Sequence, residues 1–193
     1  MKIEIEELEK ILEGRAETQK IEFKGACFWD VNIFAKDILA MSNVKDGGFI
    51  IIGVKDQTFE REGIIEKMKH SYKIDEMKDQ MTIFSDPHVE FEVQNQKDKN
   101  NLDYIIIRVF PFEEIPVICR HDCPAAGTHN GIMYYRNRNR RVESAHVSNS
   151  YDMRTIIELA TIKMLQQKED MGFKVNNSAD SIKDKLEKEL EGL

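Results

Sequence analysis

The residues best suited to chemistry lie in a short charged segment near the start of the chain, Glu17-Thr18-Gln19-Lys20-Ile21-Glu22-Phe23-Lys24. Apolar and charged residues alternate through its last four positions, which predicts a strand with Glu22 and Lys24 on one face. Metal-dependent nucleases use such a pair: the carboxylate holds a divalent cation, and the lysine neutralises charge on the phosphate that is cut. The same alternation also suits an exposed edge strand with surface ion pairs.

A basic run, Arg136-Asn137-Arg138-Asn139-Arg140-Arg141, is conspicuous because the whole chain carries a formal net charge of −7. Overall charge does not indicate nucleic-acid binding, so such binding would need a local patch. Arginine and asparagine donate to phosphate oxygens, and Tyr134 or Tyr135 could stack on an unpaired base. The alternative is a solvated loop whose arginines pair with the surplus acids. The residues predicted to contact nucleic acid here are Tyr135, Arg136, Arg138, Arg140 and Arg141.

The composition predicts one domain outside the membrane. At 193 residues the chain can bury a single core, and no apolar run approaches the roughly 20 residues of a membrane span. The acidic start lacks the features of a secretory signal, and the three cysteines, Cys27, Cys119 and Cys123, favour reduced thiols. We therefore expect a cytoplasmic protein. Cys119, His121 and Cys123 could also be zinc ligands, although their spacing matches no standard zinc motif.

Hydrophobic periodicity favours an α+β fold with a mixed or antiparallel sheet of about five to six strands, flanked by helices. The expected helices cover residues 4–14, 30–43, 71–84 and 150–169, and the expected strands cover 17–24, 49–54, 88–95, 102–109, 117–119 and 132–136.

The C-terminal part is predicted to be separate from the main domain, which would span residues 1–170. Residues 171–193 are expected to form a linker and a charged helix with a narrow apolar seam, which suits either a partner helix or a frayed tail. Residues 150–193 could accordingly recruit a partner protein or join copies of the chain into a homodimer or larger oligomer. The seam consists of Ile182, Leu186, Leu190 and Leu193.

Several separated blocks of the sequence occur in a definite order. They are the segment 17–24, the helix end Ala40-Met41-Ser42-Asn43, the segment Gly47-Gly48-Phe49-Ile50-Ile51-Ile52-Gly53-Val54-Lys55-Asp56, then Pro116-Val117-Ile118-Cys119, Gly131-Ile132-Met133-Tyr134-Tyr135-Arg136 and Glu143-Ser144-Ala145. In this order the blocks resemble the AlbA-like domain of the Schlafen family (Schlafen AlbA_2). The resemblance covers about residues 5 to 160 and depends on the whole set of blocks.

This resemblance implies an α+β lobe that binds nucleic acid and, in the nuclease members, a three-acid site that holds Mg²⁺ or Mn²⁺ and cleaves RNA. Matched by position, the acids are Glu17, Glu22 and Asp56, and Lys24 would steady the phosphate. Lys55 stands where many members have another aspartate, so its amine could approach a phosphate or weaken metal binding. The nuclease members pair two such lobes in a longer chain, and this chain would need to dimerise to build the same cradle.

The three acids that the resemblance implies also suit a metal ion on chemical grounds. Three carboxylates near strand ends suit a hard divalent cation, which takes oxygen ligands and keeps some of its waters. Crowded carboxylates would raise one another's pKa, so the cluster favours a metal ion or a basic partner. Alternatively, Glu17 caps a turn and Asp56 serves in another, while Glu22 simply pairs with Lys24.

The expected function is binding of RNA or single-stranded nucleic acid, with metal-dependent endonucleolytic cleavage and a preference for RNA. Two alternatives remain: a noncatalytic DNA- or RNA-binding regulator, and an interaction module of a larger complex.

Overall fold

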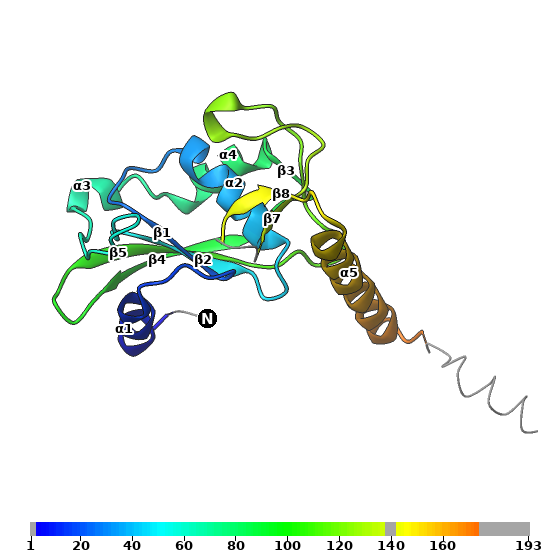
Figure 1. Ribbon diagram of the computed structural model, residues 1–193, viewed down its shortest axis with the longest axis horizontal. Coiled ribbons are helices and arrows are strands. Elements are labelled where there is room, and N and C mark those ends of the chain that lie inside the picture. Colours follow the sequence, from blue (N-terminus) through cyan, green and yellow to red (C-terminus); the bar gives the residue numbers. More distant parts are fainter. Residues whose placement is uncertain (1–2, 138–141, 174–193) are drawn as a thin grey trace, which may run out of the picture.

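A four-stranded mixed sheet forms the centre of the computed structural model, which describes residues 3–137 and 142–173 (Figure 1). Its strands, in spatial order, are β1 (Ile21–Lys24), β2 (Gly48–Ile52), β5 (Asp103–Val109) and β4 (Phe91–Lys97). β1 is parallel to β2, whereas β5 is antiparallel to both of its neighbours. Two small antiparallel sheets pair β3 (Ser85–Asp86) with β6 (Ile118–Cys119), and β7 (Tyr134–Arg136) with β8 (Ser144–His146). The predicted α+β fold is confirmed.

The helices cover both faces of the central sheet (Figure 1). They are α1 (Ile5–Gly14), α2 (Val31–Ser42), α3 (Glu66–Lys69), α4 (Ile74–Thr82) and α5 (Ser150–Asp170), with a 3-10 turn η1 at Pro124–Ala126. Side chains alternate along β2, so Ile50 and Ile52 pack with α2 and α4, whereas Ile51 packs with α1 on the opposite face. The sheet therefore separates two apolar cores.

The predicted strand 17–24 is shorter in the structure, because its first half folds back as a tight turn. Thr18 N donates to Ile21 O at 3.0 Å, and Ile21 N donates to Thr18 O at 3.2 Å. β1 begins only at Ile21, so Glu17 precedes the turn and does not share a strand face with Glu22. Sequence analysis also missed α3, β3 and β8, which have two to four residues each and too little length to show periodicity.

Both ends of α2 are fixed by side-chain hydrogen bonds. At its start, Asp30 Oδ1 accepts from Asn32 N at 2.9 Å, which is a typical N-cap contact. At its end, the buried Asn43 side chain accepts from Val117 N at 2.8 Å and donates to Val117 O at 2.8 Å and to Tyr134 O at 2.9 Å. Asn43 thereby fixes the end of α2 to the segment before β6 and to β7.

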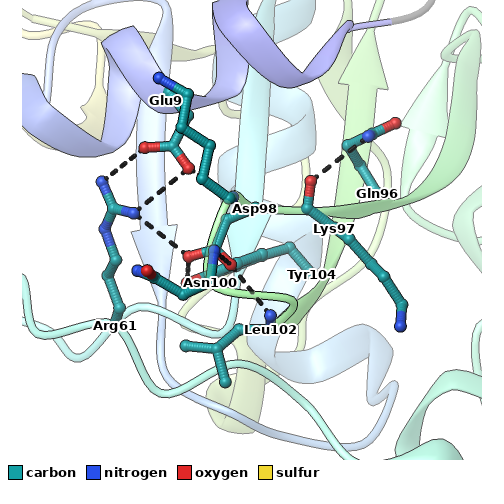
Figure 2. A network of polar contacts seen from close by, with 9 residues as sticks. Glu9, Arg61, Gln96, Lys97, Asp98, Asn100, Leu102 and Tyr104 are labelled. Atoms are coloured by element: carbon teal, nitrogen blue, oxygen red, sulfur yellow. Dashed lines mark hydrogen bonds and ion pairs between the residues drawn. The ribbon is translucent and has the colours of Figure 1, made fainter.

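A buried polar network holds α1 against the end of the sheet at which the β4–β5 turn lies (Figure 2). Arg61 Nη2 lies 3.0 Å from Glu9 Oε2, and Arg61 Nη1 lies 3.2 Å from Asp98 Oδ2. The Lys99 backbone N–H donates to Glu9 Oε1 at 2.7 Å, and Asp98 accepts from Leu102 N at 2.9 Å. The network joins α1, the segment after β2 and the β4–β5 turn.

Helix α5 extends away from the sheet (Figure 1) and buries only Asp152 and Ile156. Several of its large apolar side chains are exposed, among them Tyr151, Ile157 and Ile162. No helix in the described ranges is long and apolar enough to cross a membrane. The apolar seam predicted at 182–193 lies outside the described residues, so pairing of chains through residues 150–193 stays a prediction.

The turn between α2 and β2 gives a test of the fold. Gly47 has φ +68°, and a Cβ atom there would lie 2.1 Å from Val109 O. We expect Gly47→Ala to lower the free energy of unfolding by more than about 1 kcal/mol, because it adds both backbone strain and a clash. Gly14→Ala is the control, since a Cβ at Gly14 would have nothing within 4 Å. Equal urea unfolding midpoints for the two variants would contradict this account of the turn.

Candidate functional site

Glu17, Glu22 and Asp56 line one cavity, with a volume of about 440 Å³. Glu22 comes from β1, Glu17 from just before the Thr18–Ile21 turn, and Asp56 from the segment after β2. Because β1 and β2 are parallel, with Lys24 opposite Ile52, their C-terminal ends meet at the same edge of the sheet. The structure thus brings the three predicted acids to one place.

Arg136 lies inside the domain beside Glu22. Its side chain is 1% exposed, and its Nη1 lies 2.5 Å from Glu22 Oε2. Its Nη2 donates to Thr18 O at 2.9 Å and to Ile21 O at 3.1 Å. The sequence predicted a surface contact with a nucleic-acid backbone, but the guanidinium instead braces the turn before β1.

Lys24 links Glu22 to a further acid that sequence analysis did not select. Its Nζ lies 2.7 Å from Glu22 Oε1 and 2.8 Å from Asp37 Oδ2. Burial alone would lower the pKa of the Lys24 amine, but the charges of Asp37 and Glu22 outweigh it and raise the pKa above its ordinary value. Asp37 lies on α2 and is buried, and no pattern in the sequence marked it as part of the site.

Both carboxylate oxygens of Glu22 are therefore held by cations. Asp37, Lys24, Glu22 and Arg136 form a row of alternating charge, which we call the charge row. Buried charges are tolerated when each has a partner of opposite sign. The charge row is neutral as a whole, and Glu22 is occupied as an ion-pair partner.

Glu17 is half-buried, and its Oε1 accepts a long hydrogen bond, 3.4 Å, from Phe23 N. Burial and the charge of Glu22 raise the pKa of the Glu17 carboxyl above its ordinary value, and the charge of Asp56 adds to the rise. The Phe23 N–H and Arg136 oppose this rise without cancelling it. The negative charges of Glu22 and Asp56 thus both act on the Glu17 carboxyl.

The cavity fits a hard cation by its chemistry but not as a three-carboxylate cage. Within residues 3–137 and 142–173, no three His, Cys, Asp or Glu side chains are grouped so as to hold a metal ion. Glu22 is committed to Lys24 and Arg136. Mg²⁺ is often bound through only one or two carboxylates together with waters and substrate phosphates. Glu17 and Asp56 are the two predicted acids that remain for such a role.

The other predicted residues lie elsewhere. Lys55 is exposed, and its Nζ lies 2.9 Å from Glu60 Oε2. Tyr135 is buried, and its hydroxyl accepts from Gln19 Nε2 at 2.9 Å, so its ring is not presented for stacking. Arg138, Arg140 and Arg141 lie outside the described residues.

The cysteines considered as zinc ligands are used in other contacts. Cys119 Sγ donates to His121 O at 3.3 Å, and Cys123 Sγ donates to Asn32 Oδ1 at 3.2 Å. His121 is exposed, and its ring packs edge-on against Phe84. These three side chains form no metal-binding group within the described part of the chain.

The cavity lining is acidic as a whole, with five acids against three cations and hence a formal balance of −2. The acids are Glu17, Glu22, Asp37, Asp56 and Glu143, and the cations are Lys24, Lys36 and Arg136. A phosphate would be repelled by this balance, whereas a divalent cation would offset it.

Comparison with known proteins identifies the family to which the chain belongs. The sequence profile described as Schlafen, AlbA_2 matches residues 17–145, more than half of the chain. The chain belongs to the Schlafen AlbA_2 family. The match includes every residue that lines the acidic cavity, and membership in this family points to nucleic-acid binding.

The other comparisons give information about the fold alone. No curated protein matches the sequence. The structure is similar to the DIP2311 protein from Corynebacterium diphtheriae, with a TM-score of 0.50, 17% sequence identity, and coverage of 78% of this chain and 27% of that chain. This Schlafen AlbA_2 chain thus spans about a quarter of the length of that protein.

The burial of Arg136 can be tested by comparing two ion pairs with the same separation. The Lys20–Asp46 pair is also 2.5 Å long, but both side chains are about half exposed. We expect Arg136→Met to lower the free energy of unfolding by about 3 kcal/mol or more, because it removes one of the two cations that hold the buried Glu22 and the hydrogen bonds to Thr18 O and Ile21 O. Lys20→Met should cost less than about 1 kcal/mol. Similar losses in urea unfolding would refute a bracing role for Arg136.

The raised pKa of Glu17 predicts that replacing this residue increases the thermal stability of the protein in a pH-dependent way. The folded state holds this proton more tightly than the unfolded chain, so stability is lost as pH rises through the folded-state pKa. Glu17→Gln should therefore raise the Tm at pH 7, and the gain should disappear near and below the ordinary value of 4.5. Thermal unfolding at pH 7 and pH 4 measures this, with Glu13→Gln on the exposed face of α1 as control. A gain of the same size at both pH values would contradict the electrostatic explanation.

Proposed function

We propose that this protein binds RNA or single-stranded nucleic acid and cleaves a phosphodiester bond in the acidic cavity with the aid of Mg²⁺ or Mn²⁺. The observation that carries the proposal is the cavity itself: three acids with overlapping fields, a charge balance of −2, and a position wholly inside the family-matched segment. A phosphate enters such a cavity readily only when a cation offsets the acids. Family membership supports the choice of a nucleic acid as ligand.

Each residue of the cavity has a distinct part in this proposal. Glu17 and Asp56 would hold the divalent cation. When bound, such an ion polarises the phosphodiester and activates a water or a 2′-hydroxyl. Lys24 uses two of its N–H donors on Glu22 and Asp37, which leaves the third for a phosphate oxygen. Glu22 acts as a positioning residue, because it fixes Lys24 and Arg136.

Cleavage can be tested with labelled structured RNA and single-stranded DNA, incubated with Mn²⁺ or with chelator. We expect cutting only with the metal, and a fall of about 10²-fold or more for Asp56→Asn and for Glu17→Gln, because either change removes a charge that holds the ion. Asp46→Asn is the control: Asp46 is also exposed, and it pairs with Lys20 outside the cavity. Cutting that survives chelation, or that neither variant slows, would refute the proposal.

One observation favours a second candidate, a noncatalytic binding protein. Both oxygens of Glu22 are occupied, so the three acids are not all open to a metal ion. Binding of RNA or DNA without cutting by wild type, in the presence of Mn²⁺, would identify this alternative. The expected homodimer, and a partner recruited through residues 150–193, would fit either candidate.

A further inference from the structure

A second cavity, with a volume of about 500 Å³, adjoins the acidic one. Lys36, Glu143 and Ser144 line both cavities. The second cavity extends from this shared wall toward His129 and His146. The two cavities therefore form neighbouring parts of one depression, with α2 on one side and the β7–β8 pair on the other.

Lys36 differs from the other two cations of the acidic cavity. Lys24 and Arg136 are neutralised in the charge row. Lys36 takes part in no ion pair or hydrogen bond among the described residues, although it is half-buried. Its Nζ lies 3.8 Å from the position that a Cβ atom would take on Gly127, so the amine reaches over the turn that follows η1. It is thus a positive charge without an ion-pair partner in the described part of the chain, at the junction of the two cavities.

The second cavity has the chemistry of a nucleotide site. Ile132 and Ala145 supply apolar surface beside the buried Tyr134 side chain. Tyr134 is rigid, because its hydroxyl accepts from His129 N at 3.0 Å and donates to Gly127 O at 3.2 Å. Cavities of this size, mostly apolar with a few placed polar groups, are typical of small-ligand sites. A nucleotide offers a flat base for the apolar wall and a phosphate for the ammonium group.

The two cavities also differ in charge. Apart from Glu143, the titratable residues that line the second cavity are Lys36, His129, Tyr134 and His146, so its balance is not acidic. A nucleic-acid strand can therefore enter the second cavity without an added cation, whereas the acidic cavity needs one. This difference suits a strand whose scissile phosphodiester lies in the acidic cavity and whose adjacent nucleotide lies beyond Lys36.

We infer that the second cavity is a nucleotide subsite, which takes the nucleotide next to the phosphodiester in the acidic cavity, with Lys36 bound to the phosphate between them. The inference deepens the proposed function and rests on its choice of a nucleic acid as ligand. It does not depend on cleavage. It assigns Lys36 of α2 to phosphate binding.

The test is the affinity of the full chain for a fluorescent single-stranded RNA octamer, measured by anisotropy in chelator over a salt series. We expect Lys36→Gln to weaken binding by about tenfold, because it removes one charge-assisted contact. The slope of log K against log salt should also fall by about 0.7, the value for one phosphate contact on a single strand. Lys78→Gln, on α4 and paired with Glu90, is the matched control and should behave as wild type.

A second variant tests the cavity without changing charge. Ala145→Leu fills the apolar part of the subsite and should weaken binding several-fold while leaving the salt slope unchanged. Thermal unfolding confirms that each variant is folded before its affinity is compared.

The outcomes separate the inference from the proposed function. If Lys36→Gln binds with wild-type affinity and salt slope, the subsite is wrong, whether or not the protein cuts RNA. If Lys36→Gln has a lower affinity and a smaller salt slope than wild type, but wild type does not cut RNA with Mn²⁺, the subsite is supported and the proposed cleavage is refuted. If wild type does not bind the octamer in chelator, the subsite is refuted, because its cavity needs no cation. The proposed function is refuted as well only if RNA is neither bound nor cut with Mn²⁺.

Discussion

The buried contact between Arg136 and Glu22 determines how the rest of the site is arranged. Arg136 belongs to β7 and Glu22 to β1, two strands in different sheets. The guanidinium also donates to the carbonyls of Thr18 and Ile21 in the turn before β1. One side chain thus fixes both the position of Glu22 and the turn that follows Glu17. A buried guanidinium charge is costly without a partner of opposite charge, and the pairing of Arg136 with Glu22 keeps the two strands together.

This arrangement divides the charges of the cavity into two groups. The charge row is internally neutral, and its members hold one another in position. Glu17, Asp56, Glu143 and Lys36 form no ion pair within the described residues, and they line the cavity with charges available to a ligand. Helix α2 contributes to both groups through the consecutive residues Lys36 and Asp37. The hydrogen bonds of Asp30 and Asn43 at its two ends therefore set the geometry of both cavities.

Local patterns in the sequence predicted what depends on local structure. The periodicity of β2 and of α2 gave their bounds to within about two residues, and the blocks shared with the Schlafen AlbA_2 family placed Glu17, Glu22 and Asp56 together. The roles of Arg136 and Asp37 could not be predicted. Each depends on partners from other elements, and a charged residue beside polar neighbours looks the same whether it is exposed or enclosed.

The separation of Glu22 and Arg136 along the chain, 114 residues, has a consequence for biosynthesis. A ribosome adds about 5–20 residues per second, so the arginine follows the glutamate by roughly ten seconds. During that interval the first acids of the cavity lack their guanidinium partner, and β1 lacks the brace on its preceding turn. Contacts between such distant residues also slow folding, because a long loop must close before they form. The turn before β1 therefore cannot gain its guanidinium contacts until β7 has left the ribosome.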